Sequence, residues 1–395
     1  MEQVIEKAIG ELQLDKSKWS LTKFGDVAIQ QKQSVDRDNT ELTLYVKGEH
    51  MGSEDLHLRE WGELTDEYLG PAFIRKFEEG DILYGSRRTY LRKVVIAPFS
   101  GITSNTTFVI KANEKRIDKR LLPFVLMSEG FTENSIRNSK GSVNPYINWK
   151  DIANYEFLLP PKDQQSQLAE LLWAMDEVIE REKEVLERLV QLRKTSHKND
   201  FLNYKRSSFK IGDYSEKVGS GVTPTGGSKV YTDNGVRLIR SQNVLHGEFD
   251  FSEIAFISDK IDNKMKSSRV LNGDVLLNIT GASIGRSAVY KEDQSANVNQ
   301  HVCIIRTNEN LHPDFLCEFI NSSFGQEQIR LLQVGGNREG LNFATIKQMR
   351  FPKFAMSEQQ KIMVKYNLNI EGIFSSRSKI SASQALQKSL INQIF

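Results

Sequence analysis

The sequence predicts an α+β protein with an internal pseudo-twofold repeat, in which two α/β globular domains are separated by two long antiparallel helices that form a coiled coil. Three observations predict this fold. Short motifs from the first half of the chain return in the same order in the second half. A long amphipathic pattern follows each half. The segments before these patterns hold short β-type runs between Gly, Asn and Pro residues.

Four motifs carry the repeat. Gly-Asp-Ile-Leu at residues 80–83 returns as Gly-Asp-Val-Leu at 273–276, an offset of 193 residues. The other pairs are Gly25-Asp26 with Gly212-Asp213, residues 104–110 with 298–305, and residues 158–161 followed by Gln164-Gln165 with Phe351-Pro352 followed by Gln359-Gln360. A preserved order with a small drift in offset is typical of a duplication with loop insertions. We therefore predict two diverged copies.

The expected parts follow in order along the chain. They are an N-terminal helix at 1–14, a first globular domain at 15–162, a central helix at 163–205, a second globular domain at 206–356 and a C-terminal helix at 357–395. Within the domains, strands are expected at 82–84, 94–97, 108–110, 275–277 and 302–305, and short helices near 119–128 and 313–321. Each domain has about 150 residues, which is enough to bury a core.

The two long helices are predicted from their apolar spacing. In the first, apolar residues follow one another at three- and four-residue steps: Leu168, Leu171, Leu172, Met175, Val178, Ile179, Val185, Leu186, Leu189 and Leu192. We expect Asp163 to cap this helix, and Ser357 with Gln360 to form a capping box on the second. Serines at 375–383 predict fraying in the second helix. An apolar stripe on one side of a helix must be covered, which favours antiparallel pairing of the two.

Composition excludes several classes of protein. The chain has 53 basic and 51 acidic residues, so a nucleic-acid site would have to be a local patch. No apolar run approaches the ~18 residues of a membrane span, and the first residues do not resemble a secretory signal. The two cysteines, Cys303 and Cys317, have no paired spacing, which argues against a disulfide scaffold or a cysteine zinc site and favours the cytoplasm.

We find no catalytic, metal or cofactor motif. A phosphate-binding loop is absent, and residues 281–285 lack the glycine spacing of a dinucleotide-binding turn. Residues 143–146, Val-Asn-Pro-Tyr, have one proline where the motif of amino-methyltransferases has two, and no glycine-rich loop precedes them. The six histidines are scattered, and His50 and His57 lack the spacing of a metal site.

Acid-free polar segments favour DNA binding instead. Residues 82–113 and 134–150 contain no Asp or Glu. Arginine pairs with guanine edges, and asparagine or glutamine with adenine, while lysine and hydroxyl groups hold phosphates. The candidate DNA-binding residues are Ser86, Arg87, Arg88, Arg92, Lys93, Asn105, Lys140, Asn144, Asn148, Arg240, Asn243, Thr280, Ser283, Arg286, Asn299, Gln300, Asn337 and Arg338.

The arrangement resembles the DNA-specificity subunit of type I restriction-modification systems. A Gly-Asp-Ile/Val-Leu turn, a later Gly- and Asn-containing loop, a proline boundary with Gln-Gln and a long helix all occur twice, and residues 386–395 also look like that family's C-terminus. The resemblance implies two target recognition domains, each reading one half of a bipartite, asymmetric site in double-stranded DNA. It also implies that the helices set the spacing.

The same resemblance implies partners. Two methyltransferase (modification) subunits would dock on the helices and carry S-adenosylmethionine, and restriction subunits with ATPase and nuclease activity would join the complex. The specificity subunit itself would hold no cofactor and would not be catalytic. Two alternatives stay open: an enzyme, such as a nuclease, with an unrecognised site, and a scaffold that uses the coiled coil without binding DNA.

Overall fold

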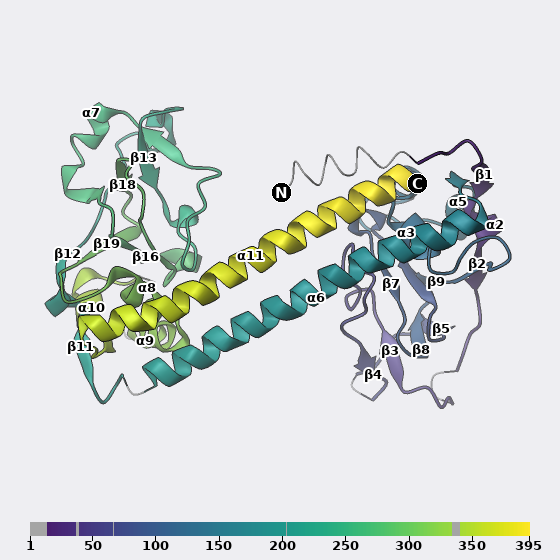
Figure 1. Ribbon diagram of the computed structural model, residues 1–395, viewed down its shortest axis with the longest axis horizontal. Helices are drawn as coiled ribbons and strands as arrows, with labels where there is room; N and C mark the ends of the chain where they lie inside the picture. Colours follow the sequence, from purple (N-terminus) through teal and green to yellow (C-terminus); the bar gives the residue numbers. More distant parts are fainter. Residues whose placement is uncertain (1–13, 37–38, 66, 203, 334–339) are drawn as a thin grey trace. The chain divides into compact units, whose positions relative to one another are not determined.

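The computed structural model describes residues 14–36, 39–65, 67–202, 204–333 and 340–395. The predicted N-terminal helix lies outside them except for Leu14. The chain forms two compact units: residues 1–184 with 376–395, and residues 185–375. Each long helix therefore contributes to both units (Figure 1).

Unit 1 contains two four-stranded sheets. One has the order β2 (Ala28–Gln31), β9 (Thr107–Ala112), β6 (Ile82–Gly85) and β7 (Val94–Ile96), all antiparallel. The other has the order β4 (Gly62–Glu63), β3 (Leu44–Val46), β8 (Gly101–Ser104) and β5 (Phe73–Phe77), with β3 and β8 parallel. A separate pair joins β1 (Ser20–Lys23) to β10 (Glu156–Leu159). The helices are α2 (Phe24–Val27), α3 (Leu122–Met127), α4 (Glu129–Arg137) and α5 (Trp149–Ala153), with the 3-10 turn η1 (Thr89–Leu91).

Strand alternation places the core of unit 1 on both faces of the first sheet. Successive side chains on a strand point to opposite faces. Ile82 and Tyr84 accordingly join the core made with the helices, while Leu83 packs in the core between the two sheets. The apolar runs that predicted β6, β7 and β9 are thus buried on both sides.

Unit 2 repeats this topology strand for strand. Its first sheet is β12 (Ser215–Ser220), β19 (Val302–Thr307), β16 (Val275–Asn278) and β17 (Ser287–Val289). Its second is β14 (Ala255–Ile257), β13 (Val236–Ile239), β18 (Ala296–Val298) and β15 (Arg269–Val270), with β13 and β18 parallel. β11 (Ser208–Lys210) pairs with β20 (Arg350–Pro352). The predicted internal repeat is confirmed.

The remaining elements of unit 2 are helices and 3-10 turns. The helices are α7 (Asp259–Asp262), α8 (Pro313–Asn321), α9 (Ser323–Gln333) and α10 (Phe343–Gln348). The 3-10 turns are η2 (Ile211–Tyr214), η3 (Gly227–Val230), η4 (Ser241–Asn243), η5 (Lys266–Ser268) and η6 (Gly281–Ser283). Helices α3 and α8 confirm the short helices expected near 119–128 and 313–321.

The recurring Gly-Asp motif builds the turn before the central strand of each first sheet. Gly80 and Gly273 have φ of 83° and 90°, a conformation that favours glycine. The buried Asp81 and Asp274 carboxylates accept the backbone N–H of Glu78 and Leu271, each three residues earlier, at 2.8 and 2.7 Å. The motif is therefore structural in both units.

The Gln-Gln motif also makes equivalent hydrogen bonds in the two units. The equivalent residues are shifted by one position from the pairing that the sequence comparison gave. Gln165 accepts the N–H of Asp118 and donates to the carbonyls of Pro160 and Arg116. In unit 2, Gln359 accepts the N–H of His312 and donates to the carbonyls of Phe354 and Asn310. Gln165 thus corresponds to Gln359, so the sequence-based pairing of Gln164 with Gln359 is wrong.

The long helices are α6 (Lys162–Phe201) and α11 (Met356–Ile394) (Figure 1). They run antiparallel within each unit. In unit 1, Gln387 donates to the carbonyl of Leu172 at 3.2 Å and Lys379 pairs with Glu182 at 3.2 Å. In unit 2, Asn369 donates to the carbonyl of Leu189 at 3.0 Å. The predicted antiparallel pairing is confirmed in each unit.

Three details of these helices differ from the prediction. Asp163 lies in the first turn of α6 and is not its cap. The reciprocal contact at the start of α11 is made by Ala355, whose N–H donates to Glu358 at 2.8 Å, so Ser357 and Gln360 are not the capping pair. The serine-rich stretch of α11 is continuous helix, because small residues suit the packed side: Ser376 is buried.

The predicted apolar seam of α6 is only partly covered. Leu168, Leu172 and Ile179 are buried. Four other residues, spaced seven apart on one side of the helix, are exposed by 39, 50, 43 and 56%: Leu171, Val178, Val185 and Leu192. The stripe is wider than one partner helix covers.

Among the described residues, no helix is long and apolar enough to cross a membrane.

Candidate nucleic-acid interface

In unit 1, three separate polar segments meet at the end of β6. They are the turn at residues 86–92, the β8–β9 turn at 105–106, and the hairpin loop at 139–148. The N–H of Arg88 donates to Pro145 O at 2.7 Å, and that of Ile147 donates to Ser86 O at 2.9 Å. The N–H of Ser86 donates to Thr106 O at 3.2 Å. Parts of the two acid-free stretches therefore form one surface, made of these three segments, which we call the unit 1 interface.

Six of the candidate residues in unit 1 are exposed on these segments: Arg87, Arg88, Asn105, Lys140, Asn144 and Asn148. Arg88 Nε donates to Asn144 Oδ1 at 3.2 Å, which ties the turn to the hairpin loop. Asn148 lies at the N-cap of α5, and its amide donates to Asp151 at 3.3 Å. Lys140 Nζ lies 3.8 Å from Asp151.

The other three candidates in unit 1 are committed to the domain itself. Ser86 is buried and donates to Thr106 O. Arg92, whose side chain is 12% exposed, pairs with Glu54 and Glu129, each at 2.9 Å. Lys93 is half-buried and donates to Gly48 O. Sequence reasoning could not identify these roles, because the carboxylate partners of Arg92 lie 38 and 37 residues away along the chain.

Unit 2 has a corresponding surface, the unit 2 interface. The turn after β16 holds Thr280, Ser283 and Arg286, and the β18–β19 turn holds Asn299 and Gln300. A short chain of contacts joins them: Thr280 Oγ1 lies 2.6 Å from His301 Nδ1, and Gln300 Nε2 lies 3.1 Å from His301 Nε2. Asn337 and Arg338 lie outside the described residues.

Two more candidates of unit 2, Arg240 and Asn243, lie at η4. This turn is hydrogen-bonded to the end of β16, because the Asn278 amide donates to Ser241 O at 2.8 Å and to Val244 O at 3.2 Å. Asn243 is 1% exposed, accepts the N–H of Arg240 at 3.0 Å and donates to Asp250 O at 2.9 Å. Arg240 stacks over Tyr231 at 5.8 Å and donates to Glu253 O. Asn299 is also buried, and its Oδ1 accepts the N–H of His301 at 3.1 Å. Gln300 is exposed, and Ser283 and Arg286 are half-buried.

The unit 1 interface also contains apolar and aromatic side chains that were not candidates. Val143, Tyr90 and Tyr146 are exposed by 91, 52 and 42%. Residues 143–146, which superficially resemble a methyltransferase motif, form part of the exposed hairpin loop. An apolar residue flanked by Gly, Ser and Asn in an acid-free stretch was the available signal for this loop.

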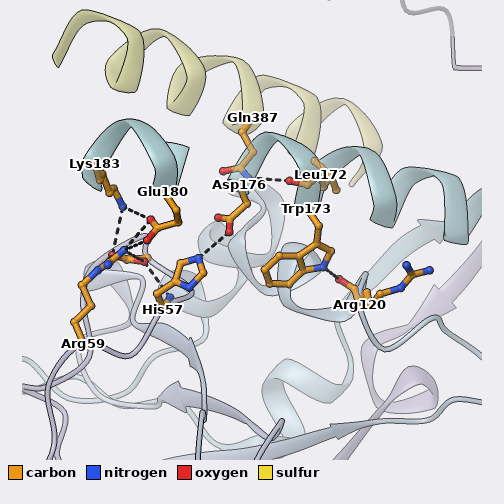
Figure 2. Close-up of polar contacts among 10 residues, drawn as sticks. His57, Arg59, Arg120, Leu172, Trp173, Asp176, Glu180, Lys183 and Gln387 are labelled. Carbon is orange, nitrogen blue, oxygen red and sulfur yellow. Dashed lines mark hydrogen bonds and ion pairs between the residues drawn. The ribbon is translucent and has the colours of Figure 1, made fainter. Parts of the chain in front are cut away.

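A cluster of ionisable residues joins the domain of unit 1 to α6, as Figure 2 shows. Asp55, His57 and Glu180 could together offer ligand atoms to a metal ion. However, Arg59 pairs with Asp55 at 2.9 Å and with Glu180 at 2.8 Å, and Lys183 pairs with Glu180 at 2.9 Å. Because these cations already neutralise the carboxylates, the cluster acts as a structural joint.

His57 forms the second part of the same joint. Its Nε2 lies 2.7 Å from Asp176 Oδ2 on α6 (Figure 2). The hydrogen bond to Asp176 raises the pKa of His57 above its usual value. Close by, Trp173 donates to the carbonyl of Arg120 at 2.9 Å. These contacts fix the domain to the first half of α6.

Unit 2 has its own joint to α6. Arg193 makes two hydrogen bonds to the Glu318 carboxylate, at 2.7 and 2.6 Å, and His197 Nε2 lies 2.5 Å from it. Burial would raise the pKa of Glu318, but the hydrogen bonds from His197 and Arg193 bring it below its usual value. Glu318 is thus a buried carboxylate that is held ionised by its partners.

Comparison with known proteins agrees with the repeat. The family model for the type I restriction modification DNA specificity domain matches residues 16–191 and again residues 206–365. The chain belongs to this family. It is 24% identical over 346 residues to the type I restriction enzyme MjaVIII specificity subunit of Methanocaldococcus jannaschii, covering 80% of each chain. It is 25% identical over 283 residues to the EcoBI specificity subunit of Escherichia coli, covering 64% of this chain and 59% of that protein.

Solved structures show the same fold. A type I restriction-modification S subunit from M. genitalium matches with a TM-score of 0.64 and 13% identity, covering 97% of each chain. A chain from a structure of a type I R-M system matches with a TM-score of 0.54 and 15% identity, covering 95% of this chain and 98% of that one.

Proposed function

We propose that the chain is the DNA-specificity subunit of a type I restriction-modification complex. Each domain reads one half of a bipartite, asymmetric site in double-stranded DNA. The observation that carries this proposal is that the DNA specificity family model matches each repeat once. In both units, the turn after the central strand and the turn between the two sheets come together, as the contacts of Ser86 with Thr106 and of Thr280 with His301 show.

Differences between the two interfaces support an asymmetric target. The unit 1 interface carries Arg87, Arg88 and Lys140, whereas the described part of the unit 2 interface carries Thr280, Gln300 and Arg286. Arginine, amide and hydroxyl side chains prefer different base edges. Two different half-sites are therefore expected.

We propose a narrower set of DNA contacts than the sequence alone indicates. It comprises the exposed or half-buried candidates Arg87, Arg88, Asn105, Lys140, Asn144, Asn148, Thr280, Ser283, Arg286 and Gln300, together with Asn337 and Arg338. Ser86, Arg92, Lys93, Arg240, Asn243 and Asn299 are proposed to support these residues, because their side chains bind other parts of the chain.

The long helices are proposed to set the spacing of the half-sites and to dock two modification subunits. Each unit exposes apolar helix residues that a partner could cover: Leu171 and Val178 in unit 1, and Val185, Leu192, Val364, Leu368 and Phe374 in unit 2. Such exposed residues are typical of a protein interface. S-adenosylmethionine and the methyl transfer would belong to the modification subunits, and restriction subunits would complete the complex. The chain alone would hold no cofactor and catalyse no reaction.

The test is to sequence methylated adenines in cells with and without this gene, in the presence of its modification subunit. A split motif that depends on the gene is expected. Purified chain, free of partners, should neither methylate nor cleave DNA. Methyl transfer by the isolated chain, or no gene-dependent motif, would contradict the proposal.

Because the substrate would be cellular DNA, we also propose a cytoplasmic location, which cell fractionation can test.

A further inference from the structure

The turn at residues 86–92 holds two arginines in a backbone conformation that favours glycine. Arg88 and Arg92 have φ of 49° and 51°, and Glu54 is the other non-glycine residue with positive φ among the described residues. A side chain in this region clashes with its own backbone, which glycine avoids. In the corresponding turn of unit 2, glycines stand at both places: Gly281 with φ of 73° and Gly285 with φ of 89°. A positive φ thus recurs at both places, with glycine in one repeat and with arginine in the other.

The strain at Arg92 has a structural explanation. Its guanidinium pairs with Glu54 and Glu129 and donates to Met127 O, so it stabilises the domain. Arg88 lacks such compensation. Among the described residues, no carboxylate lies within ion-pair distance of Arg88, and its side chain makes one hydrogen bond, from Nε to Asn144 Oδ1 at 3.2 Å. Glycine would satisfy the backbone of residue 88 better, so the side chain is retained for a contact outside the chain.

The contact with Asn144 orients the guanidinium. A hydrogen bond at Nε fixes the plane of the group and leaves both terminal nitrogens without a protein acceptor among the described residues. Asn144 is itself positioned by the hairpin loop, whose Pro145 O accepts the N–H of Arg88 at 2.7 Å. A planar pair of donors held in place matches the O6 and N7 acceptors of guanine. A phosphate can also accept from this pair, but it can be bound by lysine as a point charge, so replacement by lysine distinguishes the two contacts.

We propose that Arg88, positioned by Asn144, reads a guanine in the half-site of unit 1. This assignment rests on the proposed function. It adds the base class and the residue pair, and it explains why arginine occupies a glycine-type position in this repeat. Gly281 lacks a side chain at the corresponding position, so unit 2 must read its half-site with other residues.

The test compares Arg88→Gly, Arg88→Lys and Asn144→Ala in the complete complex with its modification subunits. Three quantities are measured: the methylated motif, the affinity for DNA as a function of salt, and the melting temperature. Arg88→Gly should leave the melting temperature unchanged or raise it, because it relieves the strain. It should lower affinity for the cognate site about 10- to 100-fold and lose selectivity at one guanine only. Arg88→Lys should lose the same selectivity, and Asn144→Ala should show a weaker form of it.

Lys115→Ala is the matched control for loss of one positive charge. Lys115 is exposed and lies beyond the C-terminal end of β9, whereas the interface lies at its N-terminal end. It should leave the motif unchanged. A uniform loss of affinity across sequences that lysine restores would assign Arg88 to a phosphate and overturn the proposal. A lower melting temperature for Arg88→Gly would assign it to the fold and also overturn it. If the wild-type complex has no sequence-dependent methylation, the proposed function itself fails.

Discussion

At the scale of single residues, equivalent positions in the two repeats are of two kinds. Some carry the same residue and stabilise the domain, and others carry different residues on the two proposed interfaces. Gln165 and Gln359 make the same three hydrogen bonds in their own units. Arg88 and Gly281 both have a positive φ but differ in side chain. Structural residues are therefore repeated, whereas residues on the proposed interfaces differ.

The glutamines give a direct test of structural equivalence. Gln165→Ala and Gln359→Ala should each destabilise their own unit by about 1–3 kcal/mol, because each leaves buried backbone groups without partners. Chemical unfolding followed by a probe in each unit measures the effect. Gln167→Ala and Gln360→Ala, both exposed on the same helices, are the controls and should change little. Equal effects of buried and exposed glutamines would contradict the assignment.

The contact between His57 and Asp176 predicts a pH dependence. The hydrogen bond to Asp176 raises the pKa of His57 above its unfolded value of about 6.5. The contribution to stability is therefore complete below that value and is lost as the pH rises through the higher pKa of the folded state. Since the His57 side chain is 36% exposed, the contribution should be at most about 1 kcal/mol.

Unfolding of the chain in urea at pH 5.5 and pH 8.5 measures this contribution. His57→Gln should reduce the difference in stability between the two pH values. Asp55, Glu180, Arg59 and Lys183 are present in both proteins and provide a common background. The same pH dependence in wild type and His57→Gln would show that the contact contributes nothing.

The independence of the two interfaces is also tested by single residues. Arg87 is exposed in unit 1 and Arg286 is half-buried in unit 2. Arg87→Ala should weaken recognition of one half-site, and Arg286→Ala should weaken recognition of the other. If the arginine contacts a base, the free energy of DNA binding should become less favourable by about 1–3 kcal/mol for the cognate half-site; if it contacts a phosphate, binding should weaken evenly across sequences. Methylated-site sequencing and salt-dependent binding distinguish these cases. A mutation that altered both half-sites would contradict separate reading.

The candidate site was only partly predictable because sequence does not show burial. The acid-free composition of residues 82–113 and 134–150 predicted DNA contacts, and the structure brings the parts at 86–92 and 139–148 together. Arg87 and Arg92 look alike in sequence, yet one is exposed and the other pairs with Glu54 and Glu129. Distant partners decide which arginine is available to a ligand.

At the scale of elements, the sequence predicted β6, β7, β9, β16 and β19 of the first sheets. It did not predict β2, β12 and β17, nor any strand of the second sheets. β6, β9, β16 and β19 have continuous apolar runs because both of their faces are buried. Strands such as β4 and β15 have two residues each, and β5 carries Arg75 and Lys76. Short or charged strands give no clear period of two.

Helix α11 shows how packing overrides composition. Its serine-rich stretch remains helical, and Ser376 is 3% exposed. Ser376→Leu should destabilise the chain by about 1–3 kcal/mol, because the larger side chain has no space in a packed contact. Ser375→Leu, at the exposed neighbouring position, is the control. Chemical unfolding compares the two. A stable Ser376→Leu would show that this part of the helix is loosely packed.

At the scale of the whole molecule, the repeat explains why each long helix belongs to both units. α6 begins in unit 1 and ends in unit 2, and α11 runs in the opposite sense, with the boundaries at residues 184/185 and 375/376. The joints to α6 are made by Asp176 in unit 1 and by Arg193 and His197 in unit 2. The helical segment between these joints is therefore the part that the proposed function assigns to spacing.

A matched insertion in both helices tests this role. Four residues added between Glu184 and Val185, and four between Ser375 and Ser376, keep the antiparallel register and leave every joint intact. Four helical residues add about 6 Å and a rotation of about 40°. At ~3.4 Å per base pair, the unread gap should grow by one or two base pairs while both half-sites stay the same. An insertion in α6 alone, which breaks the register, is the control and should impair methylation. Altered half-sites with an unchanged gap in the matched variant would mean that the helices do not set the spacing, since the contacts that read bases lie in the domains.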